Sequence, residues 1–358
     1  MTLPITVISG LDRVATYSAG RDLLLGDPHA RLVSHCIDQI GVGLVSRTIE
    51  AGDGSVSAHL VDLAHGCVAC TLREDVLPTL RALALEPGVD RVVLVLPEAV
   101  EPMGFLDNFH HVADEDGNTV ADVCSVVAVV AMIDSPRLVG RLTAAATLAD
   151  QGLAAGPGDD RHLAEVLVAQ IESADVIVAP DATEQQRGVL RLLNAEASLP
   201  DRLPAHIDSV FDFVRTTRRT LPASLAEHSH DHREGDAWRV HWRTDRPLHP
   251  LRLLTALEQV GDVSLRGRGY LHLATRPATS VEWDSAGRQL RLGAPDVEVC
   301  ESGAWLSFVG IDERWWLIRD ALDAAVLTDD EMAYAARDWQ RIDDPFAGLW
   351  SGSGDGNR

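Results

Sequence analysis

Arg91-Val92-Val93-Leu94-Val95-Leu96 is the stretch on which the prediction of the fold depends. The run is apolar and rich in β-branched residues, as is typical of parallel strands buried on both faces of a sheet. Similar runs occur at Pro4–Ser9, Val123–Ile133 and Ala174–Ala179. Because stretches with helical spacing, such as Arg161–Ile171, lie between them, the pattern predicts a doubly wound α/β domain with a mostly parallel sheet.

The pattern changes after about residue 210. Residues 221–236 are polar and contain three alternating histidines, which indicates a linker. Beyond it, several short predicted strands and two predicted helices indicate a smaller α+β domain with a mostly antiparallel sheet. We therefore predict domains at 1–220 and 237–348, joined by the linker, and a disordered Gly/Ser-rich tail at 349–358.

Composition limits the classes of function. The chain has 358 residues and a net charge of -23, so we expect no direct DNA binding through a broad basic surface. The longest apolar run, Val123–Ile133, is shorter than the roughly 20 residues that a membrane helix needs. The first residues lack the basic region of a signal peptide, and the five cysteines form no even set. We expect a cytoplasmic protein with no membrane contact and no disulfide framework.

The loop after the first predicted strand has the position of a phosphate-binding loop but not its residues. That loop needs Gly-x-x-x-x-Gly-Lys-Ser/Thr, in which lysine neutralises phosphate charge and the hydroxyl holds Mg²⁺. Counting from Gly10, the second glycine is Ala15, the lysine is Thr16 and the Ser/Thr is Tyr17. Asp12 adds negative charge where the phosphates would lie. We predict that GTP is not a cofactor, while the hydroxyls of the loop leave weak anion binding open.

Gly66-Cys67-Val68-Ala69-Cys70-Thr71 is the most distinctive motif. Two thiols at this spacing can bind one tetrahedral zinc ion at ~2.3 Å. Because the pair supplies only two ligands, a full site needs two more, from a partner or from this chain's candidates His65, Cys36 and His35. Redox exchange of the two thiols and a purely structural role are the alternatives.

Together these segments resemble the CobW-type family of P-loop GTPases. The segment from Gly66 to Leu77 is similar to the family's Gly-Cys-x-Cys-Cys and the Leu/Arg-Asp/Glu-Asp-Leu after it, with Ala69 at the central cysteine. Pro97–Pro102 is similar to its Glu-x-x-Gly-x-x-Asp-Pro motif without the glycine, and Ala179–Ala182 replaces the guanine-reading Asn-Lys-x-Asp. Arg246–Leu253 resembles the Arg-Pro-Phe-His-Pro-x-Arg-Leu that opens the family's C-terminal domain.

The resemblance implies a degenerate P-loop GTPase fold followed by a CobW C-terminal-type domain. The altered loop, the cysteine pair and the intact second domain together look most like an actinobacterial branch, which recruits a ribosome hibernation factor (a protein Y homologue) to the ribosome under zinc starvation. This implies a zinc-responsive adaptor rather than an enzyme, with Cys67 and Cys70 as metal ligands and with the hibernation factor and the ribosome as partners. The alternatives are a CobW-type metallochaperone GTPase that delivers zinc to a client, and a binding protein for another anion.

Three other groups of residues are candidates for a site. The linker histidines are either loose metal ligands or solvated linker residues: His228, His230 and His232. Glu98 and Glu101 are candidates for an acid/base pair at the end of a parallel strand. A basic cluster either contacts RNA or an acidic partner, or pairs with nearby carboxylates: Arg252, Arg266 and Arg268.

Overall fold

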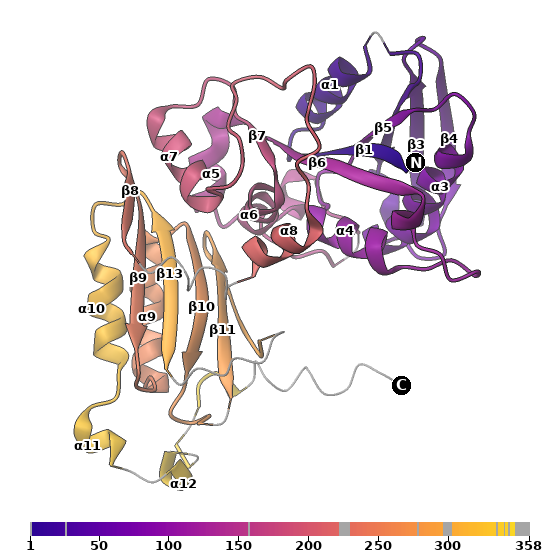
Figure 1. Ribbon diagram of the computed structural model, residues 1–358. Coiled ribbons are helices and arrows are strands. Elements are labelled where there is room, and N and C mark those ends of the chain that lie inside the picture. Colours follow the sequence, from indigo (N-terminus) through magenta and orange to yellow (C-terminus); the bar gives the residue numbers. More distant parts are fainter. Residues whose placement is uncertain are drawn as a thin grey trace. The chain divides into compact units, whose positions relative to one another are not determined.

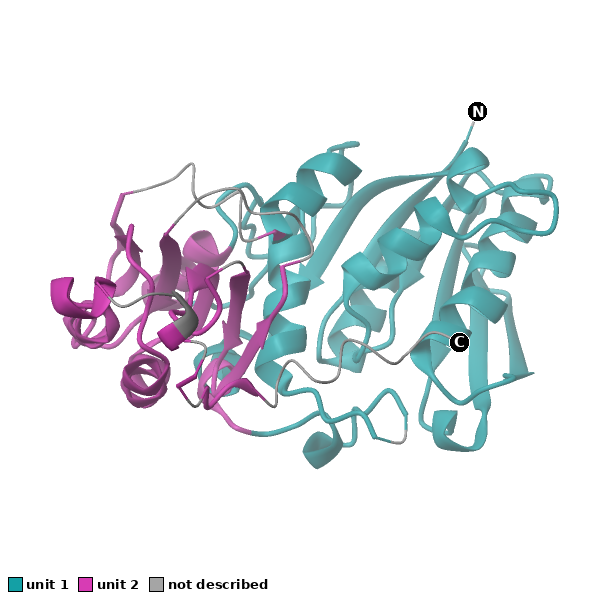
Figure 2. Ribbon diagram, turned by 90° about the horizontal axis from the view of Figure 1, so that it is seen from below, with its two compact units in different colours: residues 1–141, 146–183, 194–220 teal, residues 142–145, 184–193, 221–358 magenta. Residues whose placement is uncertain are grey.

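The computed structural model of this chain describes residues 2–25, 27–156, 158–221, 230–277, 279–295, 303–333, 336–339, 341–342 and 344–347. They form two compact units (Figure 2), of which unit 1 comprises Met1–Arg141, Ala146–Thr183 and Asn194–Thr220. Unit 2 comprises Leu142–Ala145, Glu184–Leu193 and Leu221–Arg358. The predicted tail, Cys300 and His228 lie outside the described residues. Among the described helices, none is both long and apolar enough to cross a membrane.

Unit 1 is built around a seven-stranded sheet in the order β4-β3-β2-β5-β1-β6-β7 (Figure 1). Five of its strands are parallel neighbours: β1 (Leu3–Ser9), β2 (Ala30–Cys36), β5 (Arg91–Val95), β6 (Cys124–Met132) and β7 (Val176–Val178). Two more add an antiparallel edge: β3 (Leu44–Ala51) and β4 (Val56–Asp62). The predicted doubly wound, mostly parallel sheet is confirmed.

The central strand β5 shows why its continuous apolar run indicates a strand that is buried on both faces. Val92 and Leu94 contact the core cluster that includes α3 (Leu77–Leu85) and α4 (Pro102–His111). Val93 and Val95 point the other way, into the cluster beneath α1 (Arg13–Leu24). Each side chain of this size contributes about 1.5–3 kcal/mol when fully buried, so the run holds helices on both faces.

The other helical segments of unit 1 include a continuous helical stretch that the sequence pattern did not reveal. The segments are η1 (Ile40–Val42), α2 (Val68–Cys70), the π-helix η2 (Thr71–Val76), η3 (Val120–Asp122), η4 (Ser135–Arg137), η5 (Ala149–Gln151), α6 (Leu163–Ser173) and α8 (Phe213–Thr220). α5 (Leu138–Thr143) crosses the boundary between the units. Because α2, η2 and α3 follow one another directly, the helical stretch runs without a break from Val68 to Leu85.

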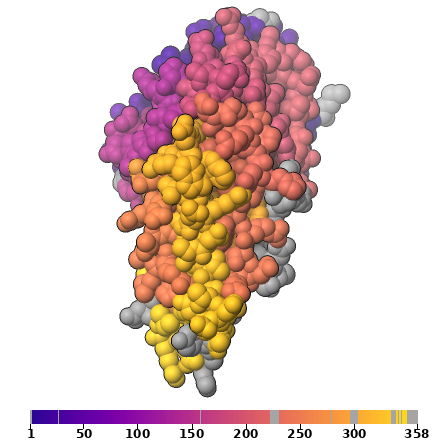
Figure 3. Space-filling view, turned by 90° about the vertical axis from the view of Figure 1, so that its left-hand side faces the viewer, coloured from indigo at the N-terminus to yellow at the C-terminus, as the bar shows by residue number. Residues whose placement is uncertain are grey.

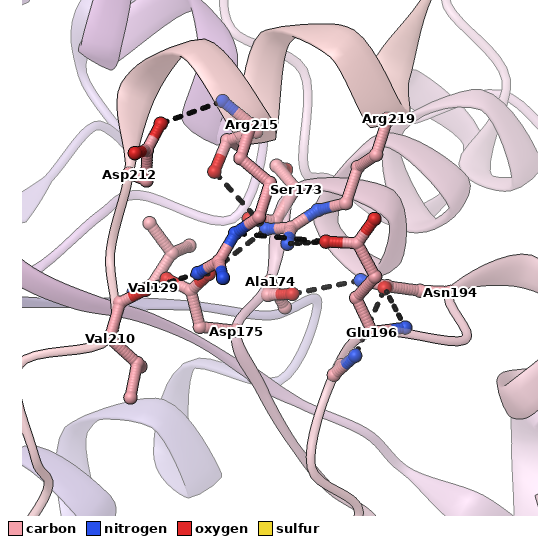
Figure 4. A network of polar contacts seen from close by, with 12 residues as sticks. Val129, Ser173, Ala174, Asp175, Asn194, Glu196, Val210, Asp212, Arg215 and Arg219 are labelled. Carbon is pink, nitrogen blue, oxygen red and sulfur yellow. Dashed lines mark hydrogen bonds and ion pairs between the residues drawn. The ribbon is translucent and has the colours of Figure 1, made fainter. Parts of the chain in front are cut away.

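A buried polar network connects β6, α6 and α8 of unit 1 around Asp175, the residue before β7 (Figure 4). The Asp175 carboxylate accepts hydrogen bonds from the Val129 N–H at 2.9 Å and from the Arg219 guanidinium at 3.1 Å. Arg219 and Asn194 also donate to the last carbonyls of α6, at residues Ile171, Glu172, Ser173 and Ala174. This caps α6 and fixes α8 at the amino end of the parallel strands, opposite the loop that follows β1.

Unit 2 contains a six-stranded antiparallel sheet in the order β12-β11-β10-β13-β9-β8. Its strands are β8 (His232–Glu234), β9 (Ala237–Thr244), β10 (Arg266–His272), β11 (Ser280–Ala286), β12 (Gln289–Gly293) and β13 (Ala304–Gly310). Its helices are α7 (Glu184–Leu193), α9 (Pro250–Val263), α10 (Trp316–Ala325), α11 (Asp329–Met332) and α12 (Ala336–Trp339). The predicted α+β domain with an antiparallel sheet is confirmed, and β8 extends that sheet into the predicted linker.

The core of unit 2 lies between one face of the sheet and helices α9 and α10. Trp238, Trp283 and Phe308 are among its largest fully buried side chains. The indole N–H of Trp242 donates to Asp323 of α10 at 2.7 Å, which ties that helix to β9. α10 runs down the side of unit 2 that faces the viewer in Figure 3.

Candidate functional site

The loop between β1 and α1 lies at the carboxyl end of the parallel sheet, where α/β proteins bind ligands. A Cβ on Gly10 would lie 2.7 Å from the carbonyl oxygen of Met132, so only glycine fits this close approach. Asp12 is the N-cap of α1, and its carboxylate accepts a 3.0 Å hydrogen bond from the Ala15 N–H. A helix N-terminus attracts anions, and the chain's own carboxylate already takes that position.

The residues at the lysine and hydroxyl positions of the loop do not fit a triphosphate. Thr16 is 1% exposed, and its hydroxyl lies 3.1 Å from the carbonyl oxygens of both Asp12 and Arg13. Tyr17 packs against the apolar cluster beneath α1. The full sequence contains no lysine at all, so no other segment of this chain brings the missing ammonium group.

Arg13 places a guanidinium at this edge of the sheet, but carboxylates hold it on two sides. It pairs with both carboxylate oxygens of Asp38, at 2.7 and 3.0 Å, and contacts both oxygens of Glu98. The hydrogen bond with Asp38 raises the pKa of Arg13, and the same bond lowers the pKa of Asp38. Glu98 is only 4% exposed, so Arg13 is the cationic partner of a buried carboxyl group. We call these three residues the Arg13 cluster.

Sequence reasoning missed the Arg13 cluster. Arg13 is the first residue of α1, and its partners are 25 and 85 residues away in the chain. The proposed acid/base pair is not formed either, because Glu98 pairs with Arg13 whereas Glu101 pairs with Arg161 at 2.8 Å.

Cys67 and Cys70 lie at the start of the long helix that ends as α3. Cys67 is the N-cap of α2, and its sulfur accepts a 3.3 Å hydrogen bond from the Cys70 N–H. The two sulfurs are 3.1 Å apart and both residues are half-buried. A tetrahedral zinc ion with ~2.3 Å bonds holds two sulfurs about 3.8 Å apart, so a small side-chain rotation suits the pair to zinc.

The protonation state of Cys70 determines whether zinc binding must release a proton from its thiol. The hydrogen bond with Cys67 raises the pKa of Cys70 to about 11, and burial and the charge of Glu74 act in the same direction. The Cys70 thiol is therefore protonated at neutral pH, and metal binding releases its proton.

Close backbone contacts fix the turn that carries the cysteines. A Cβ on Gly66 would lie 2.0 Å from the carbonyl oxygen of Ile40 in η1. Gly156 has a φ of +153°, and a Cβ on it would lie 2.8 Å from the Gly66 carbonyl oxygen. The Glu74 carboxylate accepts a 2.9 Å hydrogen bond from the Ala64 N–H. The turn is thus held in place before any metal binds.

A buried network holds the π-helical turn that follows the cysteines. His35 Nε2 lies 2.7 Å from one oxygen of Asp75. Arg47 donates to the other oxygen at 2.6 Å and to the Thr79 hydroxyl at 2.7 Å. The network joins η2 and α3 to β2 and β3. The His35 side chain is fully buried and bound to Asp75, so it is committed to this network rather than to a metal at the cysteine pair.

The further zinc ligands suggested by the sequence are not assembled around the pair. Cys36 contacts Arg13 at 3.6 Å, and His35 contacts Asp75. Within the part of the chain that the structure describes, no group of three or more His, Cys, Asp or Glu side chains is placed to hold a metal ion. In this conformation the sulfurs of Cys67 and Cys70 contact each other, whereas Cys36 and His35 contact other side chains.

Three of the remaining sequence candidates pair with carboxylates. Arg252 pairs with Glu331 at 2.7 Å and Arg266 pairs with Asp284, as the structural interpretation of the basic cluster predicted. His232 pairs with Glu234 at 3.0 Å.

A mostly parallel α/β unit with an altered phosphate loop and a cysteine turn, followed by a unit with an antiparallel sheet, defines a class of two-domain proteins related to P-loop GTPases. The model of the CobW/HypB/UreG nucleotide-binding domain matches residues 39–194, and that of the cobalamin synthesis protein cobW C-terminal domain matches residues 238–326. The chain belongs to the CobW family.

Two similar proteins are zinc chaperones by name. Zinc chaperone Rv0106 of Mycobacterium tuberculosis is 30% identical over 395 residues, covering 98% of this chain and 94% of that protein. Zinc chaperone CobW of Pseudomonas aeruginosa is 24% identical over 234 residues, covering 62% and 58% of the two chains. The crystal structure of Zn(II)-bound YjiA GTPase from E. coli covers 91% of this chain and 100% of that chain, with a TM-score of 0.34 and 14% identity.

Proposed function

We propose that this protein is a zinc chaperone of the CobW family that works without GTP turnover, holding zinc at Cys67 and Cys70 and delivering it to a protein client. The observation that carries the proposal is the cysteine pair, whose sulfurs face each other at 3.1 Å at the start of a helix. The names of two relatives, both zinc chaperones, support the choice of metal. A site with only two protein ligands suits cargo, because a client can supply the others.

The nucleotide-independent part of the proposal is supported by the contents of the loop. The Asp12 carboxylate occupies the position at the helix N-terminus where an anion would bind. The guanidinium of Arg13 is already paired with Asp38 and Glu98. Bringing a triphosphate to this loop would set its charge against Asp12, with no lysine to offset it.

Competition with a chromophoric chelator tests the zinc site. We expect one zinc ion per chain, and at least about 100-fold weaker binding by Cys67→Ser/Cys70→Ser, because both thiolate ligands are lost. Cys36→Ser is the matched control and is expected to leave the affinity unchanged. Zinc stoichiometry and affinity that survive the double substitution would overturn this site.

Calorimetry with GTP and Mg²⁺ tests the second part of the proposal. Because the loop has no lysine and places Asp12 where the phosphates would lie, we expect no binding heat up to about 1 mM nucleotide. A Kd of 1 mM corresponds to a binding free energy of only about 4 kcal/mol in magnitude. Micromolar binding accompanied by phosphate release would replace this proposal with that of a metallochaperone GTPase that uses a variant loop.

We also propose a second function, in which the protein recruits a ribosome hibernation factor to the ribosome when zinc is scarce. Two features support it. The ion pairs of Arg13 occupy the loop after β1, whereas the sulfurs of Cys67 and Cys70 are placed to bind a metal. This combination suits an adaptor that responds to zinc rather than to nucleotide. Co-sedimentation of the hibernation factor with ribosomes should increase in the presence of the chain at low zinc. With Cys67→Ser/Cys70→Ser the increase should no longer respond to zinc. Equal co-sedimentation with and without the chain would eliminate this function.

A further inference from the structure

Strand β4 is a free edge of the unit 1 sheet. In the described structure it is the last strand in the sheet order and pairs only with β3 (Figure 1). Six of its seven residues are exposed, including two large apolar side chains, Val56 at 61% and Leu60 at 64%. An exposed edge strand with apolar side chains is a template for pairing with another chain.

β4 lacks the features by which proteins usually protect an edge. Its register with β3 runs without a bulge from Val56 opposite Glu50 to Asp62 opposite Leu44. Residues 48–72 contain no Lys, Arg or Pro, the residues that commonly block edges. In an antiparallel strand about half of the N–H and C=O groups point away from the neighbour, so β4 offers a row of unpaired backbone groups about 23 Å long.

Charge determines which partner fits this edge. Asp53 lies in the turn before β4, and Asp62 is its last residue, so an aspartate stands near each end of the strand. The whole chain carries a net charge of -23. A second copy of this chain would be repelled, because it carries the same negative net charge. A basic segment is attracted by the net charge of the chain and by the carboxylates of Asp53 and Asp62.

The edge leads directly into the cysteine turn. Four residues separate Asp62 from Cys67, and this connection is fixed by hydrogen bonds from the Leu63 N–H to the Gly43 carbonyl at 2.8 Å and from the Ala64 N–H to Glu74 at 2.9 Å. Five residue steps span at most about 18 Å. An added strand lies about 5 Å from β4, so a segment bound along β4 has one end within about 23 Å of the cysteine pair.

We propose that β4 binds an extended, basic segment of a protein partner as an added strand. The segment places apolar side chains beside Val56 and Leu60 and a cation near each of Asp53 and Asp62. Its main-chain hydrogen bonds provide affinity and its side chains provide selectivity. The inference rests on the proposed function only in that the docked partner is the one that meets the zinc site; the docking itself needs no metal.

A synthetic peptide, Arg-Val-Thr-Val-Thr-Val-Arg with blocked ends and a fluorescent label, is the probe. We expect saturable binding to the full chain by fluorescence anisotropy and slower hydrogen exchange of β4 amides in the complex. A peptide with Glu at both ends and one with N-methylated alternate residues should each bind at least about tenfold more weakly, because they lose the charge pairs or the backbone bonds. Equal binding of the N-methylated peptide would overturn strand addition.

Substitutions on the edge locate the binding surface. Val56→Lys/Leu60→Lys should weaken peptide binding at least about tenfold, because it removes the apolar contacts and blocks the edge. Leu25→Lys/Leu85→Lys is the matched control, with the same charge change at two exposed leucines of unit 1, one after the end of α1 and one in α3. Equal loss in both variants would mean that net charge alone drives binding, and the inference would be wrong.

Two further measurements separate this inference from its rivals. Cys67→Ser/Cys70→Ser should lose zinc binding and keep full peptide binding. A wild-type chain that binds the peptide but no zinc would refute only the proposed function. Retained zinc binding without peptide binding would refute only the docking edge. Sedimentation equilibrium tests the remaining occupant: a wild-type dimer that Val56→Lys/Leu60→Lys dissociates would assign the edge to a second copy.

Discussion

The two helix N-termini of unit 1 described above share a local geometry and differ in what they leave available. Asp12 caps α1 by accepting from the Ala15 N–H, and Cys67 caps α2 by accepting from the Cys70 N–H. At α1 the cap is a carboxylate, and the next residue, Arg13, is held by two more carboxylates. At α2 the cap is a sulfur whose neighbour is another sulfur. The same geometry is therefore closed to phosphate in one place and open to a soft metal in the other, because of the capping atom and the charges around it.

Removing Arg13 should have the largest effect. Arg13→Ala leaves Glu98 buried without its cation, and breaking such a pair costs about 3 kcal/mol. Hydrogen exchange of β5 amides in urea measures the stability of unit 1. Arg13→Ala/Glu98→Gln should recover more than half of the loss, and Arg137→Ala, at an exposed arginine of unit 1, should change stability by less than about 0.5 kcal/mol. A full loss in the double variant would show that the cluster is not held by charge.

The cysteine turn should depend on the network around Asp75. Asp75→Asn removes the charge that holds Arg47 and His35, so the π-helical turn loosens and zinc affinity should fall about tenfold. Chelator competition measures the affinity, and circular dichroism checks the fold. Asp114→Asn, which breaks the 2.9 Å pair with Arg81 on α3, is the control and should leave zinc affinity unchanged. Equal zinc affinity in both variants would mean that the turn is held by its backbone contacts alone.

The cap of α1 should have a moderate effect. Asp12→Ala removes the acceptor for the Ala15 N–H and should cost about 1 kcal/mol. Asp12→Ser should retain most of the stability, because serine is also a good N-cap. Urea midpoints of the three proteins provide the measurement. If serine is as poor as alanine, the carboxylate charge rather than the hydrogen bond stabilises this end.

We expect the smallest effect on stability in a pH titration of unit 2. It measures how much an ordinary, partly exposed ion pair contributes to the free energy of unfolding. The hydrogen bond from Arg252 lowers the pKa of Glu331 from 4.5 to about 2. Its contribution is therefore complete above pH 4.5 and is lost as the pH falls toward 2. Because the pair is partly exposed, we expect less than about 1 kcal/mol. The difference in urea midpoint between wild type and Glu331→Gln should shrink from pH 5 to pH 2.5; a constant difference would exclude this titration.

The strands of unit 1 were predictable because burial on both faces produces continuous apolar runs, as at β5. β4 was not, since an exposed edge strand such as Val56–Asp62 carries no such run. The helical stretch from Val68 was also missed, because cysteine and threonine give no apolar spacing at its start. Sequence alone therefore revealed the buried strands but missed an exposed edge strand and the start of a helix that lacks apolar spacing.

The candidate site was predictable only where its residues are close in sequence. The pair Cys67 and Cys70 lies three residues apart and forms a recognisable motif. Asp38 and Glu98 reach Arg13 only through the order of β1, β2 and β5 in the sheet. His35 likewise meets Asp75 across 40 residues of chain. Such pairs follow from topology, which no local pattern encodes.

The Arg13 cluster has an evolutionary consequence. A phosphate-binding loop would need glycine at Ala15, lysine at Thr16 and serine or threonine at Tyr17. Lysine at the position of Thr16 would place a cation where the side chain is almost fully buried. Removing Arg13 to leave room for phosphate would leave the buried carboxylate of Glu98 without its cation. Both changes lower stability, so the residues that occupy the loop also oppose substitutions that would create a phosphate site.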